Sequence, residues 1–166
     1  MAYIVRTADL PDLERIEEIY AYARAFMAKT GNPNQWGKNT PPHGQLVQDI
    51  AQKTLHVIEE DGLIHGVFFF WIGEDPTYGK MDGGWWREDT PYGTIHRIAS
   101  DGSGGILKTA VSYAKAQIPH IRIDTHEDNR VMQNALAKLG FQKRGIIYIA
   151  DGSPRIAYDL LPENYM

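Results

Sequence analysis

The chain has no cysteine among its 166 residues, which excludes disulfide bonds, thiolate zinc sites and a cysteine nucleophile. This absence is typical of a protein from a reducing compartment. Long apolar runs are also missing: the longest block, GVFFFWI at 66–72, is too short to span a bilayer. The N-terminus reaches a charge at Arg6 without the apolar stretch of a signal peptide. We therefore expect a cytoplasmic protein that does not enter membranes.

A strong excess of either charge is lacking as well. Lys and Arg number 17 against 21 Asp and Glu, a formal net charge of −4 at pH 7. The basic residues are scattered, which argues against a nucleic-acid surface, whereas the net charge is compatible with a small cationic partner such as an amine. The composition, 43% hydrophobic and 23% charged, is that of an ordinary globular domain. The length favours one domain over residues 1–166.

Apolar residues at three- and four-residue spacing predict a long first helix after a strand at 3–8. Asp9 precedes this helix as its N-cap, with Asp12 three residues further on, and Gly31 follows the helix end. A second helix is expected around 46–50. The N-terminal part is thus predicted to run strand, helix, helix.

A hairpin is predicted next, with strands at 55–60 and 64–72 joined by a turn at Asp61 and Gly62. The connection 73–93 is long and carries glycines and aromatic residues, and loops of this length in compact domains are often functional. The remaining elements alternate: a strand at 94–100, a helix at 104–117, a strand at 120–125, a helix at 129–139, and closing strands at 141–150 and 154–161. This order implies a mixed sheet with helices on both faces.

The stretch RIASDGSGGILKTA, residues 97–110, passes from a strand through three closely spaced glycines into a helix. Glycines at such a point let backbone N–H groups at a helix start approach a phosphate. A plain flexible turn between strand and helix is the alternative.

Three local patterns, together with the element order, resemble the GCN5-related N-acetyltransferase (GNAT) family of acetyl-CoA-dependent acyltransferases over nearly the whole chain. The opening IVRTADLPDLERIEEI is similar to the family's first strand and helix, and the segment 94–117 stands where the family binds pyrophosphate. The stretch DTHEDNRVMQNALAKLGFQKRG is the most specific of the three, with Asn129 opening a helix that closes on Leu139-Gly140-Phe141. The resemblance implies an α/β (α+β) fold: a central mixed, mostly antiparallel sheet of six or seven strands with about four helices.

The sequence departs from the family pattern at two places. The glycine turn lacks the family's Arg or Gln: one register puts Ser103 in place of the first glycine, and the other puts Ala99 at the basic position. The helix N-terminus can still donate backbone N–H groups to pyrophosphate. In addition, Leu136 stands where many members carry a tyrosine and cannot donate a proton.

The resemblance implies direct transfer from acetyl-CoA, with no metal and no protein nucleophile. The thioester would lie where the strands 94–100 and 120–125 splay apart, with a backbone N–H near Ile98 or Ala99 holding the developing oxyanion. Asn129, an N-cap by type, is near the cofactor in the family. The cofactor-binding residues expected on this basis are Arg97, Ile98, Ala99, Gly102, Ser103, Gly104, Gly105, Ile106, Asn129 and Met132.

For proton transfer we favour His126 as general base, just past a strand end, with His96 second. Tyr148 or water would protonate the leaving thiolate. The polar trio at 126–128 has no metal-site spacing and is more simply an exposed loop. Tryptophan faces suit cationic amines, so Trp36 and Trp86, in loops, are expected to bind the acceptor. Trp71 is a further candidate, although its place in an apolar strand favours the core, and such aromatics could instead mark a dimer surface.

The predicted function is acetyl transfer to a primary amine of a small molecule or peptide, with a homodimer as a possible assembly. The alternative is a non-catalytic module that binds or senses acyl-CoA, which the irregular glycine turn and Leu136 favour. A Rossmann-type nucleotide site is the poorest interpretation, because no GxGxxG follows the first strand.

Overall fold

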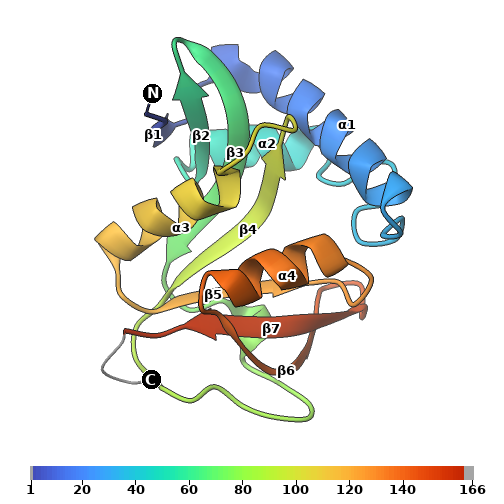
Figure 1. Cartoon of the computed structure of the whole chain (residues 1–166), viewed down its shortest axis with the longest axis vertical. Coiled ribbons are helices and arrows are strands. Elements are labelled where there is room, and N and C mark those ends of the chain that lie inside the picture. Colours follow the sequence, from blue (N-terminus) through green and yellow to red (C-terminus); the bar gives the residue numbers. More distant parts are fainter. Residues whose placement is uncertain (1, 163–166) are drawn as a thin grey trace.

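One seven-stranded sheet organises the computed structural model, which describes residues 2–162 (Figure 1). The strands lie in the order β1-β2-β3-β4-β5-β7-β6, and every neighbouring pair is antiparallel except β4 and β5. The predicted mixed, mostly antiparallel sheet is confirmed. The strands are β1 (Ile4–Thr7), β2 (Leu55–Glu60), β3 (Leu63–Ile72), β4 (Gly93–Ser100), β5 (Ile121–Thr125), β6 (Gln142–Tyr148) and β7 (Pro154–Leu160).

Four α-helices cover the two faces of this sheet, as predicted. They are α1 (Leu13–Lys29), α2 (His43–Ala51), α3 (Ile106–Gln117) and α4 (Arg130–Lys138), with short 3₁₀ turns at Leu10–Asp12 (η1) and Pro76–Tyr78 (η2). Helices α3 and α4 cross the near face in Figure 1 and share one buried cluster with the sheet, while α1 and α2 share another with the opposite face. No helix within residues 2–162 is both long enough and apolar enough to cross a membrane.

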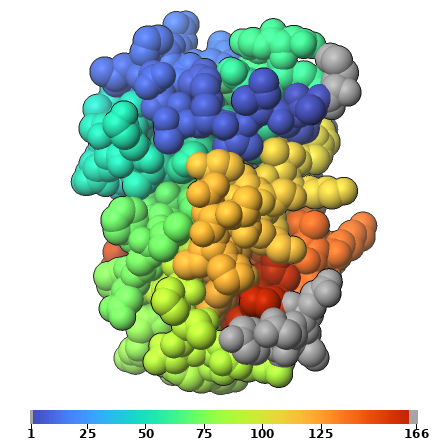
Figure 2. Space-filling model, turned by 90° about the vertical axis from the view of Figure 1, so that its left-hand side faces the viewer, coloured from blue at the N-terminus to red at the C-terminus, as the bar shows by residue number. Residues whose placement is uncertain are grey.

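The connection from 73 to 92 takes the place of a helix over one end of the sheet. Its Tyr78, Trp86 and Tyr92 form a third buried cluster with Ile147 and Ala157 of the closing strands. In Figure 2, α3 and the residues after it, in gold, lie between the N-terminal part, in blue, and this connection, in green. The long loop is therefore a structural cover as well as a wall of the site described below.

Trp71 does not lie in the core, where the sequence-based expectation placed it. The apolar strand predicted a core position, but the residue is 50% exposed, because the end of β3 extends beyond the helices that cover the sheet. Trp86, predicted to lie in an open binding loop, is 7% exposed. It stacks on the guanidinium of Arg122, 3.9 Å from the ring centroid.

Lys53, after the end of α2, has a left-handed backbone with φ +59°. A side chain in this region is strained, whereas glycine adopts it freely. We expect Lys53→Gly to raise the free energy of unfolding by about 0.5–1 kcal/mol, the strain relieved less the extra chain entropy of glycine. Urea denaturation measures the change, and Lys53→Ala, which keeps the strain, is the matched control. An equal effect of the two variants would contradict this explanation.

Candidate functional site

The site lies where β4 and β5 separate. These two parallel strands pair only at Gly93 with Ile121 and at Thr94 with Arg122, and beyond this point they diverge (Figure 1). The sequence-based expectation that the strands 94–100 and 120–125 splay apart is correct. The fork opens the middle of the sheet to a bound molecule.

A β-bulge in β4 shapes the near side of the fork. Arg97 and Ile98 together stand opposite Phe68 of β3, and Arg97 has φ +51°. The hydroxyl of Tyr20 donates to the carbonyl of Arg97 at 2.6 Å. The extra residue breaks the alternation of the strand: Arg97 reaches Asp49 of α2 on one face, while Ile98 packs into the cluster of α3 on the other.

Two cavities meet at the fork. The first, of about 400 Å³, is lined by residues of β4, β5 and β7, of α1 and α4, and of the neighbouring loops, among them His96, Asp124 and Arg155. The second, of about 360 Å³, lies between α1, the start of α3 and the start of α4. Three side chains line both cavities: Met27, Ile98 and Met132. The two cavities therefore adjoin at these side chains. We call them together the groove, and its two ends differ in chemistry.

The glycine turn borders the second cavity through Gly102 and Leu107. Its own side chains accept from two amides: Ser100 Oγ from Gly102 N and Asp101 Oδ1 from Ser103 N, both at 3.0 Å. The next five amides, at 104–108, have no acceptor among residues 2–162. Helix α3 therefore begins with a run of available donors.

Asp101 holds this turn against the rest of the fold. Its Oδ2 accepts from Arg15 Nη2 at 2.9 Å and lies 2.8 Å from His65 Nδ1. Burial would raise the pKa of Asp101, but the hydrogen bonds from Ser103 and His65 bring it below its ordinary value. The charged carboxylate thus ties the turn to α1 and β3.

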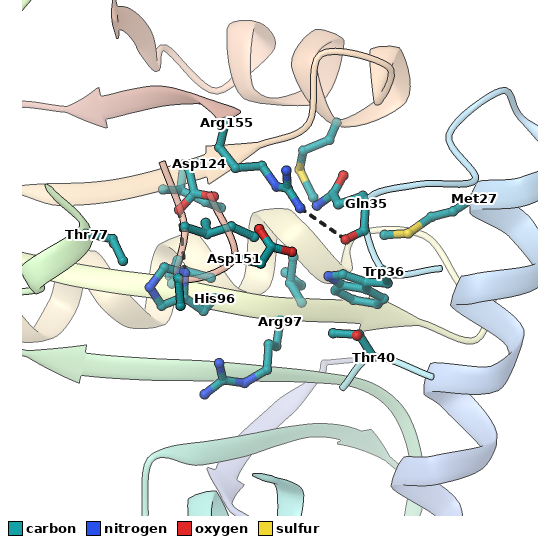
Figure 3. Close-up of a pocket in the computed structure, with 16 residues that line it drawn as sticks. Met27, Gln35, Trp36, Thr40, Thr77, His96, Arg97, Asp124, Asp151 and Arg155 are labelled. Atoms are coloured by element: carbon teal, nitrogen blue, oxygen red, sulfur yellow. Dashed lines mark hydrogen bonds and ion pairs between the residues drawn. The ribbon is translucent and has the colours of Figure 1, made fainter. Parts of the chain in front are cut away.

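His96 of β4 is the titratable side chain at the fork, and it lies between two carboxylates, of which Figure 3 shows Asp124. Its Nε2 lies 2.7 Å from Asp75 Oδ2, and its Nδ1 lies 3.7 Å from Asp124 Oδ2. Asp124 in turn accepts from the buried hydroxyl of Tyr78 at 2.7 Å. Burial would raise the pKa of Asp75, but the hydrogen bond and charge of His96, with the bonds from Thr77, lower it to about 2. This arrangement fixes the orientation of the imidazole.

The depressed pKa of Asp75 predicts a pH-dependent contribution to stability. Because the folded value, about 2, lies below the ordinary 3.8, the contribution is present above pH 3.8 and is lost as the pH falls towards 2. We expect Asp75→Asn to cost about 2 kcal/mol at pH 7 and to flatten the fall in stability below pH 4. Denaturant unfolding from pH 2 to 7 measures both effects. Asp89→Asn, on an exposed residue of the same connection, is the control, and equal profiles for the two variants would contradict the prediction.

Gln35 joins the loop before α2 to the far side of the fork. Its Oε1 accepts from Asn129 Nδ2 and from Asn32 Nδ2, each at 3.0 Å. Its main-chain oxygen accepts from Arg155 Nη2 at 3.1 Å. The loop that carries Trp36 is thereby fixed over the first cavity.

The predicted catalytic residues are not brought together. His96 lines the first cavity. His126 lines neither cavity of the groove, and its Nδ1 accepts from Asp128 N at 3.0 Å. Tyr148 is 41% exposed on β6 and donates to Asp82 at 2.7 Å, a bond that raises the pKa of its hydroxyl. The geometry favours His96 of the three.

The predicted binding residues divide between the two cavities. The second is lined by Ile98, Ala99, Gly102, Asn129 and Met132. Arg97 and Trp36 line the first, Trp86 lies in the third cluster, and Trp71 lines neither. Asn129 Oδ1 accepts from Met132 N at 3.0 Å, so it also caps α4. Ser103, Gly104, Gly105 and Ile106 belong to the turn and the start of α3.

Sequence reasoning missed Gln35, Asp75, Asp124 and Arg155. Asp124 had a usable signal, because polar residues alternate with buried isoleucines along the strand at 121–125. Asp75 stands two residues into the long connection, and Gln35 and Arg155 carry no local signal. Within residues 2–162, no three His, Asp or Glu side chains gather in a way that could hold a metal ion.

No family model and no curated protein matches the chain. Several solved structures, however, match the chain. An acetyltransferase of the GNAT family from Streptococcus agalactiae is 31% identical over 97% of this chain and 96% of its own, with a TM-score of 0.87. A putative acetyltransferase from Staphylococcus aureus is 24% identical over 94% and 97%, with a TM-score of 0.65. The structure of yncA from Salmonella typhimurium with its cofactor acetyl-CoA is 18% identical over 98% and 96%, with a TM-score of 0.60.

A seven-stranded sheet that forks between two parallel strands and carries helices on both faces is the acetyltransferase fold of these structures. The identity to the Streptococcus agalactiae protein extends over almost the full length of both chains. The chain belongs to the GNAT family of acetyltransferases.

Proposed function

We propose that the chain binds acetyl-CoA along the second cavity and transfers the acetyl group to a primary amine in the first. The observation that carries this proposal is the pair of adjoining cavities at the fork. One end of the groove offers the open amides of α3, and the other offers His96 between two carboxylates.

The second cavity fits the cofactor. The amides at 104–108, at the positive end of the α3 dipole, are suited to a pyrophosphate and take the place of the missing basic residue. Phe26, Leu107 and Val131 give the cavity an apolar lining suited to a pantetheine arm. When bound, acetyl-CoA supplies an activated acyl group, whose bond to sulfur breaks as the amine nitrogen forms the new bond.

We assign the oxyanion donor to the amide of Ile98. Asp101 N donates to His65 O at 3.0 Å, so Asp101 and His65 are a hydrogen-bonded pair of the β3–β4 ladder. Hydrogen-bonded pairs alternate along an antiparallel ladder, so Ala99 and Val67, two residues further along each strand, form the next one. Ile98, the bulged residue before Ala99, therefore turns its N–H away from β3, towards the side where β5 has diverged. This places a donor at the fork, where negative charge develops on the carbonyl oxygen.

We assign the general base to His96. It accepts the proton that the amine loses on attack, while Asp75 stabilises the imidazolium and fixes the ring. The three side chains shared by the cavities, Met27, Ile98 and Met132, carry no acidic proton. Water therefore protonates the thiolate in this mechanism.

Thiol release from acetyl-CoA with a panel of primary amines tests the proposal, together with calorimetric binding of coenzyme A. Acetylated product and saturable binding are expected. Saturable binding without turnover on any amine would instead support the acyl-CoA-sensing alternative, which the apolar junction favours. Absence of binding would overturn both.

A further inference from the structure

Arg155 of β7 is a buried cation that no carboxylate of residues 2–162 approaches within 4 Å. The residue is 5% exposed and lines the first cavity. Its guanidinium donates to two backbone oxygens, Pro154 O at 2.8 Å and Gln35 O at 3.1 Å (Figure 3). A guanidinium has five N–H donors, so donors remain, and a buried charge without an ion-pair partner is costly.

The other basic side chains of the cavity already have carboxylate partners. Arg97 is bound to Asp49, with Nη2 2.9 Å from Oδ2, and in Figure 3 it points away from Arg155. His96 is bound to Asp75. An anionic group entering the cavity would therefore find Arg155 as its partner.

The two carboxylates that face Arg155 from beyond ion-pair distance differ in kind. Asp124 is nearly buried beside His96, where an ammonium group would be held before it loses its proton. Asp151 is exposed and accepts both the N–H and the O–H of Ser153, so water screens its charge. The cavity thus pairs an anionic position near the base with a cationic position at Arg155.

We propose that the acceptor is a free α-amino acid with an apolar side chain. This proposal rests on the proposed function and specifies its substrate class. Its amine lies between His96 and Asp124, and its carboxylate accepts from Arg155. Its side chain lies along the wall formed by Met27, Trp36 and Ile149. A peptide N-terminus has the amine without the adjacent carboxylate and would leave Arg155 unpaired.

Matched acceptors test this without any mutation: leucine, leucinamide and 3-methylbutylamine, followed by the other nineteen amino acids. A charge-assisted hydrogen bond predicts that kcat/KM for leucine exceeds that for either analogue by about 10–100-fold, mainly through KM. Comparable acetylation of the three, or turnover on amines but on no amino acid, overturns the inference while leaving the proposed function intact. No coenzyme A binding and no thiol release overturn the proposed function itself.

Variants locate the effect. Arg155→Gln is expected to lower kcat/KM for leucine by about 10–100-fold more than that for 3-methylbutylamine, whose smaller loss measures what the bond to Gln35 contributes to the cavity wall. Arg155→Lys, which keeps the charge but not the paired donors, should recover part of the loss. Arg87→Gln, on an exposed residue of the 73–92 connection, is the control. Equal loss on both substrates in a variant that melts like the wild type would contradict a carboxylate-binding role, and the matched-acceptor comparison decides the case if Arg155→Gln does not fold.

Discussion

Replacing His96 by glutamine is expected to lower kcat for amine acetylation by about 100- to 1000-fold. Glutamine can keep a hydrogen bond to Asp75 but cannot accept the proton that the amine must lose. The rise of kcat with pH that a titrating base produces should disappear in the variant. Steady-state thiol release at saturating acetyl-CoA and amine, measured from pH 5.5 to 9, gives both quantities.

The matched control is His43→Gln, an exposed histidine bound to Glu17, which should leave kcat within about twofold. His126→Gln compares the two candidate bases directly. If the His126 variant loses more activity than the His96 variant, or if it alone loses the pH dependence, His126 is the base and the assignment to His96 is wrong.

Gly104→Asp is expected to raise the Kd for coenzyme A by about 100-fold, since a carboxylate there repels the pyrophosphate and competes for the same amides. A side chain at this position meets nothing within 4 Å, and the backbone does not need a left-handed glycine. An acidic residue at a helix N-terminus is itself favourable. The unbound variant should therefore melt at the same temperature as the wild type or slightly above it. Calorimetric titration and thermal unfolding measure the two effects.

Gly104→Asn is the isosteric control, because it fills the same space without a charge. It should bind coenzyme A nearly as the wild type does. Equal weakening by Asn and Asp would mean that bulk rather than charge is responsible. Unchanged binding in the Asp variant would show that the amides of α3 do not hold the pyrophosphate.

The elements themselves could be predicted from local patterns. The hairpin around Asp61 and Gly62 has the left-handed backbone that its turn sequence predicts, with φ +52° and +79°. Asp12 Oδ2 accepts from Asp9 N at 2.8 Å, as the predicted capping pair requires. Both features depend on residues within three positions of each other, so a single sequence contains the information.

The two tryptophans show where such reasoning fails. Trp71 belongs to an apolar run and is half exposed, whereas Trp86 belongs to a loop rich in polar residues and is buried. Burial depends on which segment covers a given part of the sheet. The 73–92 connection covers Trp86 together with Ile147 and Ala157, about 60 to 70 residues away. No periodicity within either segment records that contact.

Local patterns in the sequence were enough to predict the order of elements and the glycine turn that opens α3, and three of these patterns resemble the family. The elements and the turn follow from backbone preferences and hydrophobic spacing, which act over a few residues. The chemistry of the groove depends on long-range contacts. The packing of the fold produced them. It joined His96 to Asp75 and Asp124, left His126 outside, and set Arg155 against Gln35. Those partners lie 21 to 120 positions apart, and they meet because the fork and the packed loops bring the ends of separate strands to one place.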